Sequence, residues 1–135
     1  KSGSIRISPS ICYEIAFPNL VRKTAKNSDL LVTISNDTWF GRSIGPEQHL
    51  EIAQTRALEH QKSLIRATNS GISAIISREG KIEQRQNYFE EKNLEGKVMI
   101  YEGQTPYALL GNIFIYVFLI LCYMYLFYYK RTYVT

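Results

Sequence analysis

The sequence is poor in the side chains that form disulfides and hold metal ions. It has two cysteines and two histidines in 135 residues. Cys12 stands near the start and Cys122 lies inside an apolar tail, so a disulfide between them would have to join an aqueous phase to a lipid phase. No Cys/His cluster at metal-ligand spacing is present. We therefore expect no disulfide, no metal site and no cofactor.

A concentrated basic region is also missing. Of the 16 Lys and Arg residues, Lys130 and Arg131 follow the apolar tail, which leaves 14 against 12 Asp and Glu over residues 1–106. A nucleic-acid surface needs Lys and Arg gathered on one face. We therefore expect no nucleic-acid partner.

The part before the tail is long enough for one modest domain. Because no Met precedes a strand beginning near residue 5, we interpret the chain as the C-terminal portion of something larger.

A long uncharged run dominates the C-terminal region. Residues 103–129 carry no charge, and the apolar stretch 107–129 would span roughly 34 Å as a helix, against about 30 Å for a hydrocarbon core. A buried core helix is the alternative, but the domain offers too little protein to surround it. We expect a membrane-spanning helix over 107–129. Lys130 and Arg131 then favour a short cytoplasmic tail over 130–135 and place residues 1–106 outside the cytoplasm.

Strands and helices alternate in the soluble part. The patterns predict strands at 5–8, 29–35, 63–68, 71–77 and about 97–101, and helices starting at Pro18 and running from Pro46 to about Gln61. Asn69-Ser70-Gly71 has the chemistry of a hairpin turn. These elements predict a layered α/β fold whose sheet is mixed, because at least one hairpin interrupts the alternation.

Cys12 is the strongest chemical candidate. It stands between a strand and a helix N-terminus, where the helix dipole raises the thiolate fraction that a nucleophile needs. Its apolar neighbours allow an equal alternative, a small buried hydrophobe. Glu14 could accept a proton or a substrate hydrogen bond, although a turn carboxylate is commoner. His60 is interpreted as solvent-facing and nothing orients His49, so a Cys–His pair is not favoured.

Five short motifs occur in a specific order along the chain. They are CYE at 12–14, NDTWFG at 36–41, GPxQH at 45–49, RALE at 56–59 and TNxGI at 68–72. In this order and spacing the chain closely resembles the C-terminal half of the nitrilase-type domain of the apolipoprotein N-acyltransferases, a family of the nitrilase (carbon-nitrogen hydrolase) superfamily. The segment TPYALLGN and the apolar tail are similar to that family too.

The resemblance implies a fold and an activity. The fold would be the C-terminal half of a nitrilase-type α-β-β-α sandwich over 1–106, followed by one transmembrane helix. The activity would be that of an enzyme of the bacterial inner membrane, with its soluble domain on the periplasmic face. Such an enzyme transfers an acyl chain from a phospholipid to the N-terminal α-amine of a diacylglyceryl-modified lipoprotein, which is the last step of lipoprotein maturation.

The resemblance also implies residue roles. Cys12 matches the nucleophile that takes the acyl group as a thioester, and Tyr13 and Glu14 match neighbouring positions needed for activity. Trp39 and Phe40 match a loop motif, with a role on the substrate side or in plain packing.

One departure from the family's pattern concerns the catalytic base and cation. The family's catalytic Glu and Lys precede the Cys in chain order, and no Glu precedes Cys12 here. We therefore expect the chain to need the missing N-terminal part of the same enzyme and to be inactive alone. Two alternatives stay open: a membrane-anchored nitrilase-type amidohydrolase, and a non-catalytic, truncated membrane-anchored domain.

Overall fold

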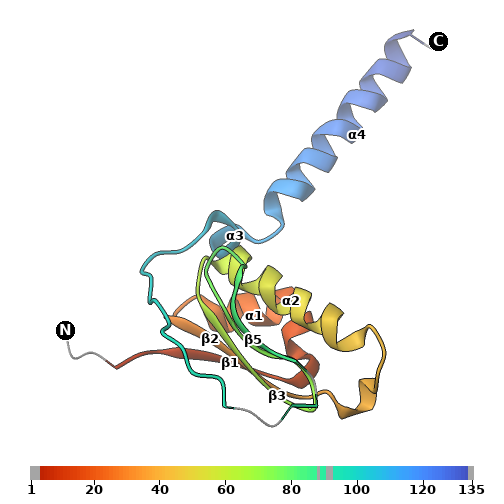
Figure 1. The fold of residues 1–135 in the computed structure, drawn as a ribbon. Helices are drawn as coiled ribbons and strands as arrows, with labels where there is room; N and C mark the ends of the chain where they lie inside the picture. The colour runs from red at the N-terminus through yellow and green to blue at the C-terminus, as the bar shows by residue number, and fades with distance from the viewer. Residues whose placement is uncertain (1–3, 88, 91–92, 134–135) are drawn as a thin grey trace.

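A five-stranded mixed sheet forms the centre of the computed structural model, which describes residues 4–87, 89–90 and 93–133. The strands lie in chain order, β1-β2-β3-β4-β5 (Figure 1). The first three pair in parallel and the last two pair antiparallel. Their bounds are β1 Ile7–Ile11, β2 Leu30–Asn36, β3 Leu64–Asn69, β4 Ser73–Ile76 and β5 Ile82–Gln86. The mixed α/β architecture expected from the sequence is confirmed.

Two helices cover one face of this sheet. A 3-10 turn, η1 (Cys12–Ala16), leads from β1 into α1 (Pro18–Ala25), and a second, η2 (Thr38–Phe40), precedes α2 (Gly45–His60). Pro18 and Pro46 lie in the first turns of their helices, where the missing N–H costs nothing. The core between sheet and helices consists of Ile15, Val21, Ala25, Leu31, Leu50, Ala53, Ala57, Leu64, Ile72, Ala74 and Ile76.

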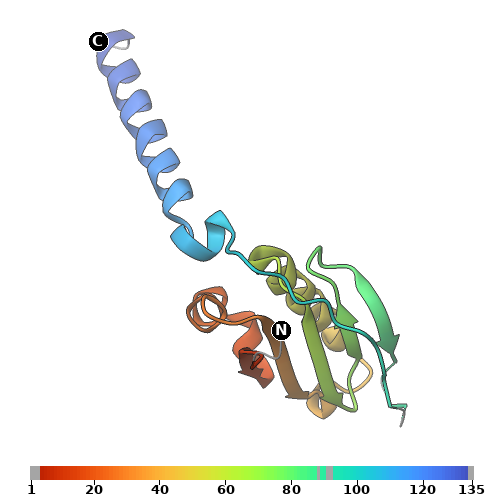
Figure 2. The same ribbon diagram turned by 90° about the vertical axis from the view of Figure 1, so that its left-hand side faces the viewer.

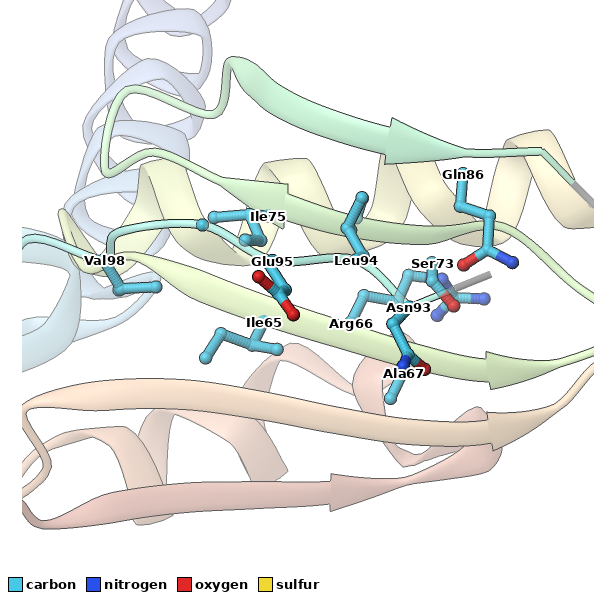
Figure 3. Close-up of a pocket in the computed structure, with 12 residues that line it drawn as sticks. Ile65, Arg66, Ala67, Ser73, Ile75, Gln86, Asn93, Leu94, Glu95 and Val98 are labelled. Carbon is cyan, nitrogen blue, oxygen red and sulfur yellow. The ribbon is translucent and has the colours of Figure 1, made fainter. Parts of the chain in front are cut away.

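The opposite face of the sheet is largely open and apolar. Ile7, Ile11 and Ile34 are each more than half exposed there. Residues 93–98 cross the same face over β3 and β4 (Figure 3), so closely that a Cβ on Gly96 would lie 2.5 Å from the Cδ1 atom of Ile75. In the expected α-β-β-α sandwich, a second sheet would pack on this face.

One predicted strand is absent and one unassigned segment is a strand. Over 97–101 the described chain pairs with no strand, and the carbonyl of Met99 instead accepts a hydrogen bond from Ser63 Oγ at 2.8 Å. The prediction was wrong because alternating apolar residues need a free sheet edge to pair with, whereas this segment approaches over the face. β5 takes the edge position, but its exposed polar side chains give no apolar alternation.

The apolar tail forms two helices instead of the single expected helix over 107–129. α3 (Pro106–Leu110) is followed by α4 (Ile113–Tyr133), and the chain turns between them at Gly111, whose φ is 58°. This left-handed conformation favours glycine. α4 projects away from the domain (Figures 1 and 2), and its segment Ile113–Thr132 is long and apolar enough to cross a membrane. The tail predicted over 130–135 is described only as far as residue 133.

Candidate functional site

Cys12 occupies a sharp turn between β1 and η1. Its φ is 53°, a left-handed conformation that is uncommon for any residue other than glycine and carries local strain. Glu14 closes the turn, because its Oε2 atom accepts the N–H of Ile11 at 2.8 Å and its carbonyl accepts the N–H of Phe17 at 3.0 Å. The strand, sharp turn and helix predicted around Cys12 are therefore present, and Glu14 has a defined structural role.

The Cys12 side chain lies in an open groove at the carboxyl ends of the three parallel strands. Ligands of open α/β sheets bind at this edge. Cys12 is half-buried there. The groove is lined by Ile11, Cys12, Ile34, Ser35, Asn36, Ala67, Thr68 and Asn69, and its residues Ile11 and Ile34 belong to the open sheet face on which a second sheet would pack. Among the described residues, no three His, Cys, Asp or Glu side chains gather closely enough to hold a metal ion.

Aromatic side chains lie on the two 3-10 turns that follow β1 and β2. Tyr13, next to Cys12, is half exposed and packs edge-on against Phe17, with ring centroids 5.9 Å apart. On η2, Trp39 is 67 % exposed and stacks on Phe40 at 4.0 Å. The Phe40 ring occupies the space where a Cβ on Gly45 would stand, so it is fixed by packing while Trp39 faces solvent. The two residues thus differ in their availability to a ligand.

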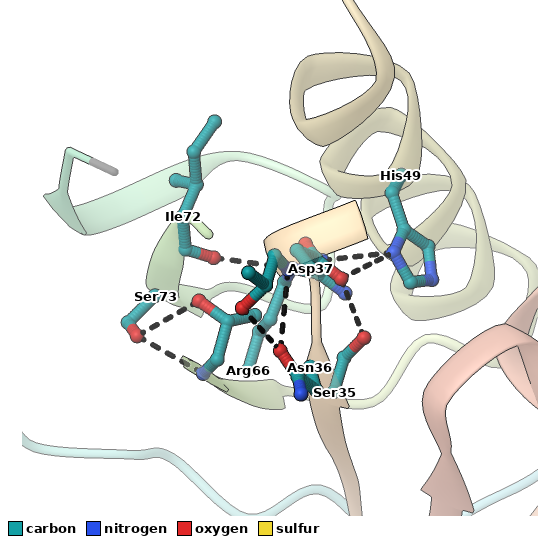
Figure 4. A network of polar contacts seen from close by, with 9 residues as sticks. Ser35, Asn36, Asp37, His49, Arg66, Ile72 and Ser73 are labelled. Atoms are coloured by element: carbon teal, nitrogen blue, oxygen red, sulfur yellow. Dashed lines mark hydrogen bonds and ion pairs between the residues drawn. The ribbon is translucent and has the colours of Figure 1, made fainter. Parts of the chain in front are cut away.

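A buried polar network lies beside the groove and was not predicted from the sequence (Figure 4). At its centre is Asp37, which is 1 % exposed. Its Oδ1 accepts from Ser35 Oγ at 2.5 Å, and its Oδ2 accepts from Arg66 Nη2 at 2.6 Å. His49 Nδ1 lies 3.1 Å from Oδ1, and because a carboxylate can only accept, the imidazole donates to it. The rings of Tyr13 and His49 are 6.1 Å apart, so the network reaches the residue next to Cys12.

Charge in this network is balanced within the protein interior. Burial raises the pKa of Asp37, but hydrogen bonds from His49 and Ser35 and the charge of Arg66 outweigh it, so that the pKa stays below its ordinary value. Burial lowers the pKa of Arg66, opposed by the charge of Asp37 and by the hydrogen bond to its carboxylate. Among the described residues, Arg66 Nη1 and His49 Nε2 are buried without a hydrogen-bond partner.

The sequence held one signal for this network. Arg66 stands at an inward position of β3, two residues after the buried Leu64, and a charged residue at such a position requires a buried partner. The identity of that partner depends on tertiary contacts, since Asp37 and His49 come from other segments.

The structure corrects the interpretation of His60. It was interpreted as solvent-facing, but its side chain is 1 % exposed, packed under α3 beside Tyr107 at 5.9 Å between ring centroids. Burial lowers the pKa of His60 to about 4, helped by the cations Lys62, Arg56 and Arg22. The polar sequence around it gave no sign of α3, which covers it from a distant part of the chain.

The fold is similar to solved structures of the nitrilase type. A carbon-nitrogen hydrolase from Helicobacter pylori G27 gives a TM-score of 0.54 at 15 % identity over 64 % of this chain and 38 % of that one. A C145A mutant of an amidase of the nitrilase superfamily, from Nesterenkonia AN1, gives a TM-score of 0.50 at 18 % identity over 65 % and 36 %. At these identities the likeness concerns the fold alone, and it confirms the nitrilase-type α/β fold.

Sequence comparisons give more similar relatives. The chain is 52 % identical over 112 residues to a protein of Pasteurella multocida named apolipoprotein N-acyltransferase, matching 82 % of this chain and 22 % of the relative. A protein of the same name from Wigglesworthia glossinidia brevipalpis is 48 % identical over 131 residues, 96 % of this chain and 26 % of the relative. The chain thus spans about a quarter or less of the length of these relatives. Residues 1–104 match the family described as carbon-nitrogen hydrolase. The chain belongs to the carbon-nitrogen hydrolase family.

Proposed function

We propose that the chain is part of an apolipoprotein N-acyltransferase and supplies its nucleophile, Cys12. The observation that supports this most directly is the position of Cys12. It lies in a strained turn at the carboxyl edge of a parallel sheet, where its side chain is partly accessible. Ligands of open α/β sheets bind at this edge, so the thiol is placed to act as a nucleophile. The names of relatives at about 50 % identity support the same assignment.

The reaction has two steps. In the first, the Cys12 sulfur attacks the ester carbonyl of a phospholipid, the carbon–oxygen ester bond breaks, and the thiol proton passes to the departing lysophospholipid hydroxyl. In the second, the N-terminal α-amine of a diacylglyceryl-modified lipoprotein attacks the thioester, the carbon–sulfur bond breaks, and an amide forms while the thiol regains a proton. Each step needs a base and a cation that stabilises the tetrahedral oxyanion. We assign these to a Glu and a Lys in the preceding part of the same enzyme.

The other predicted site residues take supporting roles. Glu14 holds the turn in which Cys12 is presented, through the Ile11 N–H. Tyr13 and Trp39, on the turns that follow β1 and β2, offer exposed aromatic surface to the lipid substrate. Phe40 positions Trp39 by stacking on it. These roles predict that Trp39→Ala weakens substrate binding, whereas Glu14→Gln reduces the reactivity of Cys12 itself.

The proposal includes a location. α4 would span the bacterial inner membrane, with Lys130 and Arg131 at its cytoplasmic end and the sheet domain on the periplasmic face. Both substrates of the reaction carry acyl chains, so a domain anchored at the membrane surface meets them where they reside.

The test is intact mass spectrometry after incubation with vesicles of phosphatidylethanolamine and phosphatidylglycerol. It compares the chain alone with the chain joined to the preceding part of the enzyme, each as parent, Cys12→Ser and Cys122→Ser. We expect a hydroxylamine-labile acyl adduct in the joined parent and in Cys122→Ser, and none in Cys12→Ser. Release of ammonia from an added primary amide, without an acyl adduct from the phospholipid, would favour the amidohydrolase alternative. A folded joined protein that forms no adduct would refute the catalytic role of Cys12.

A further inference from the structure

α3 is fixed to the domain by specific hydrogen bonds. At its start, Thr105 Oγ1 accepts the N–H of Ala108 at 3.0 Å and donates to the Glu59 carbonyl, at the end of α2, at 2.6 Å. At its end, Arg22 Nη1 on α1 donates to the carbonyls of Ala108 at 3.3 Å and Leu109 at 3.4 Å. Ala108 is 3 % exposed. The short helix is therefore joined to both α1 and α2.

The outer side of α3 is apolar and exposed. Leu109 is 52 % and Leu110 is 41 % exposed, and both lie within four residues of Ile113, where α4 begins. The candidate span of 20 residues covers about 30 Å, which fills a hydrocarbon core from edge to edge. When α4 spans a membrane, α3 therefore lies at the headgroup layer, because only residues 111 and 112 separate the two helices.

Basic side chains accompany α3 into that layer. Lys23 and Lys26 are exposed at the end of α1, next to Arg22, which binds α3. The backbone of Lys26 is itself held to the segment before α3, because its carbonyl accepts from Gln104 Nε2 at 2.9 Å. Two carboxylates share a hollow with Lys26: Asp29 is paired with Arg6 at 2.8 Å, and Glu102 lies within electrostatic reach of the same guanidinium. The hydrogen bonds of Arg22 and of the Lys26 carbonyl join the end of α1 to the α3 region, so its lysines and the exposed leucines of α3 belong to neighbouring elements. Lysines together with exposed leucines are the composition of a surface that binds anionic lipid headgroups.

We infer that α3 and the last turn of α1 form a second membrane contact, an interfacial surface in which Leu109 and Leu110 lie at the acyl boundary and Lys23 and Lys26 bind anionic headgroups. The inference rests on the proposed membrane-spanning role of α4. The inference also gives the domain a fixed orientation at the membrane. The hydrogen bonds of Thr105 and Arg22 join α3 to α1 and α2, so the sheet domain is not connected to the interface by a flexible linker alone.

The test measures membrane depth with an environment-sensitive NBD label on single cysteines. The background is the full chain with Cys12→Ser and Cys122→Ser, reconstituted in vesicles that carry spin-labelled lipids. Ile120→Cys reports whether α4 is in the membrane, Leu109→Cys reports the proposed surface, and Glu51→Cys on exposed α2 is the aqueous control. We expect deep quenching at 120, a blue shift with shallow quenching at 109, and aqueous emission at 51.

Two outcomes would overturn the inference in different ways. An aqueous label at 109 with a deep label at 120 refutes the interfacial surface but leaves the membrane span intact. Aqueous labels at both positions refute the span as well, and with it this part of the proposed function.

The role of the lysines is tested by Lys26→Gln, which should reduce the difference in shallow quenching at 109 between anionic and neutral vesicles. Arg42→Gln, which also removes one exposed cation, should not, and equal effects of the two variants would refute a specific role for Lys26.

Discussion

Replacing Asp37 with asparagine tests whether the buried network stabilises the domain. The carboxylate accepts from Ser35, His49 and Arg66, and all three bonds lie in the interior. An asparagine has one acceptor oxygen, so its NH₂ group would meet a donor on one side. Asp37→Asn leaves the guanidinium of Arg66 buried without a counter-charge.

The expected loss of stability is large compared with ordinary surface changes. Removing one partner of a buried ion pair costs about 3–5 kcal/mol. With a urea dependence of about 2 kcal/mol per M for a small domain, the unfolding midpoint should fall by about 2 M. Ser35→Ala removes one hydrogen bond while keeping the ion pair, so it should cost about 1–2 kcal/mol and stay measurable if Asp37→Asn fails to fold.

The assay is urea unfolding of the full chain in detergent micelles, followed by the fluorescence of the single tryptophan, Trp39, two residues after Asp37. Glu47→Gln is the control, because it breaks the ion pair with Arg85, both of whose side chains are about one third exposed, and should cost only about 0–1 kcal/mol. Adding Arg66→Met to Asp37→Asn should restore part of the loss, since no buried charge is left unpaired.

Two results would refute this reasoning. One is an Asp37→Asn protein whose stability lies within about 1 kcal/mol of the parent, which would mean that the guanidinium finds another partner or reaches water. The other is an Asp37→Asn/Arg66→Met double variant whose loss of stability relative to the parent equals the sum of the losses of the two single variants, because independent sites add and members of one network do not.

Three further predictions concern the rest of the domain. The lowered pKa of His60, about 4 against an ordinary 6.5, makes its contribution to stability complete above pH 6.5 and lost as the pH falls to 4, by roughly 3 kcal/mol. His60→Leu should reduce the change of the urea unfolding midpoint between pH 4 and pH 6.5. An unchanged pH dependence of the midpoint would contradict this role of His60. Thr105→Val should destabilise the protein by about 1 kcal/mol in urea unfolding through loss of the α3 cap. The control is Thr55→Val. The exposed Thr55 hydroxyl donates only to the Glu51 carbonyl within α2, so this change should cost less stability, and equal losses of stability in the two variants would count against the cap. Gly45→Ala should displace the Phe40 ring, because the new Cβ would lie 2.2 Å from its Cδ1 atom, and should shift the tryptophan emission; an unchanged spectrum would show that the ring is not fixed by this contact.

Local sequence patterns predicted the elements that carry their own signal. The apolar β-branched run over 29–35 is β2, Leu30–Asn36, and the turn at 69–71 joins antiparallel strands. Pro46 marked the start of α2 within one residue. The turn at Cys12 was predicted because strand, turn and helix signals stand next to one another. Each of these features is decided by neighbours in sequence, so a pattern can report it.

Features decided by distant contacts were missed. Asp37, His49 and Arg66 come from three segments, and no local pattern shows that they meet. The burial of His60 depends on α3, more than 40 residues later. The helix break at Gly111 was hidden inside an apolar run, because hydropathy does not register one glycine with a positive φ.

The order of the strands has a consequence for how the protein is made. Because spatial order follows chain order, each strand pairs with the one synthesised just before it: Ile7 with Leu30, Leu31 with Leu64, and Leu64 with Ile76. The intervals between these partners are 23, 33 and 12 residues, so no strand has to wait for the last part of the chain. The sheet can grow strand by strand as the polypeptide leaves the ribosome or the translocation pore. Once residue 86 has emerged, the nascent chain already holds the five strands described here.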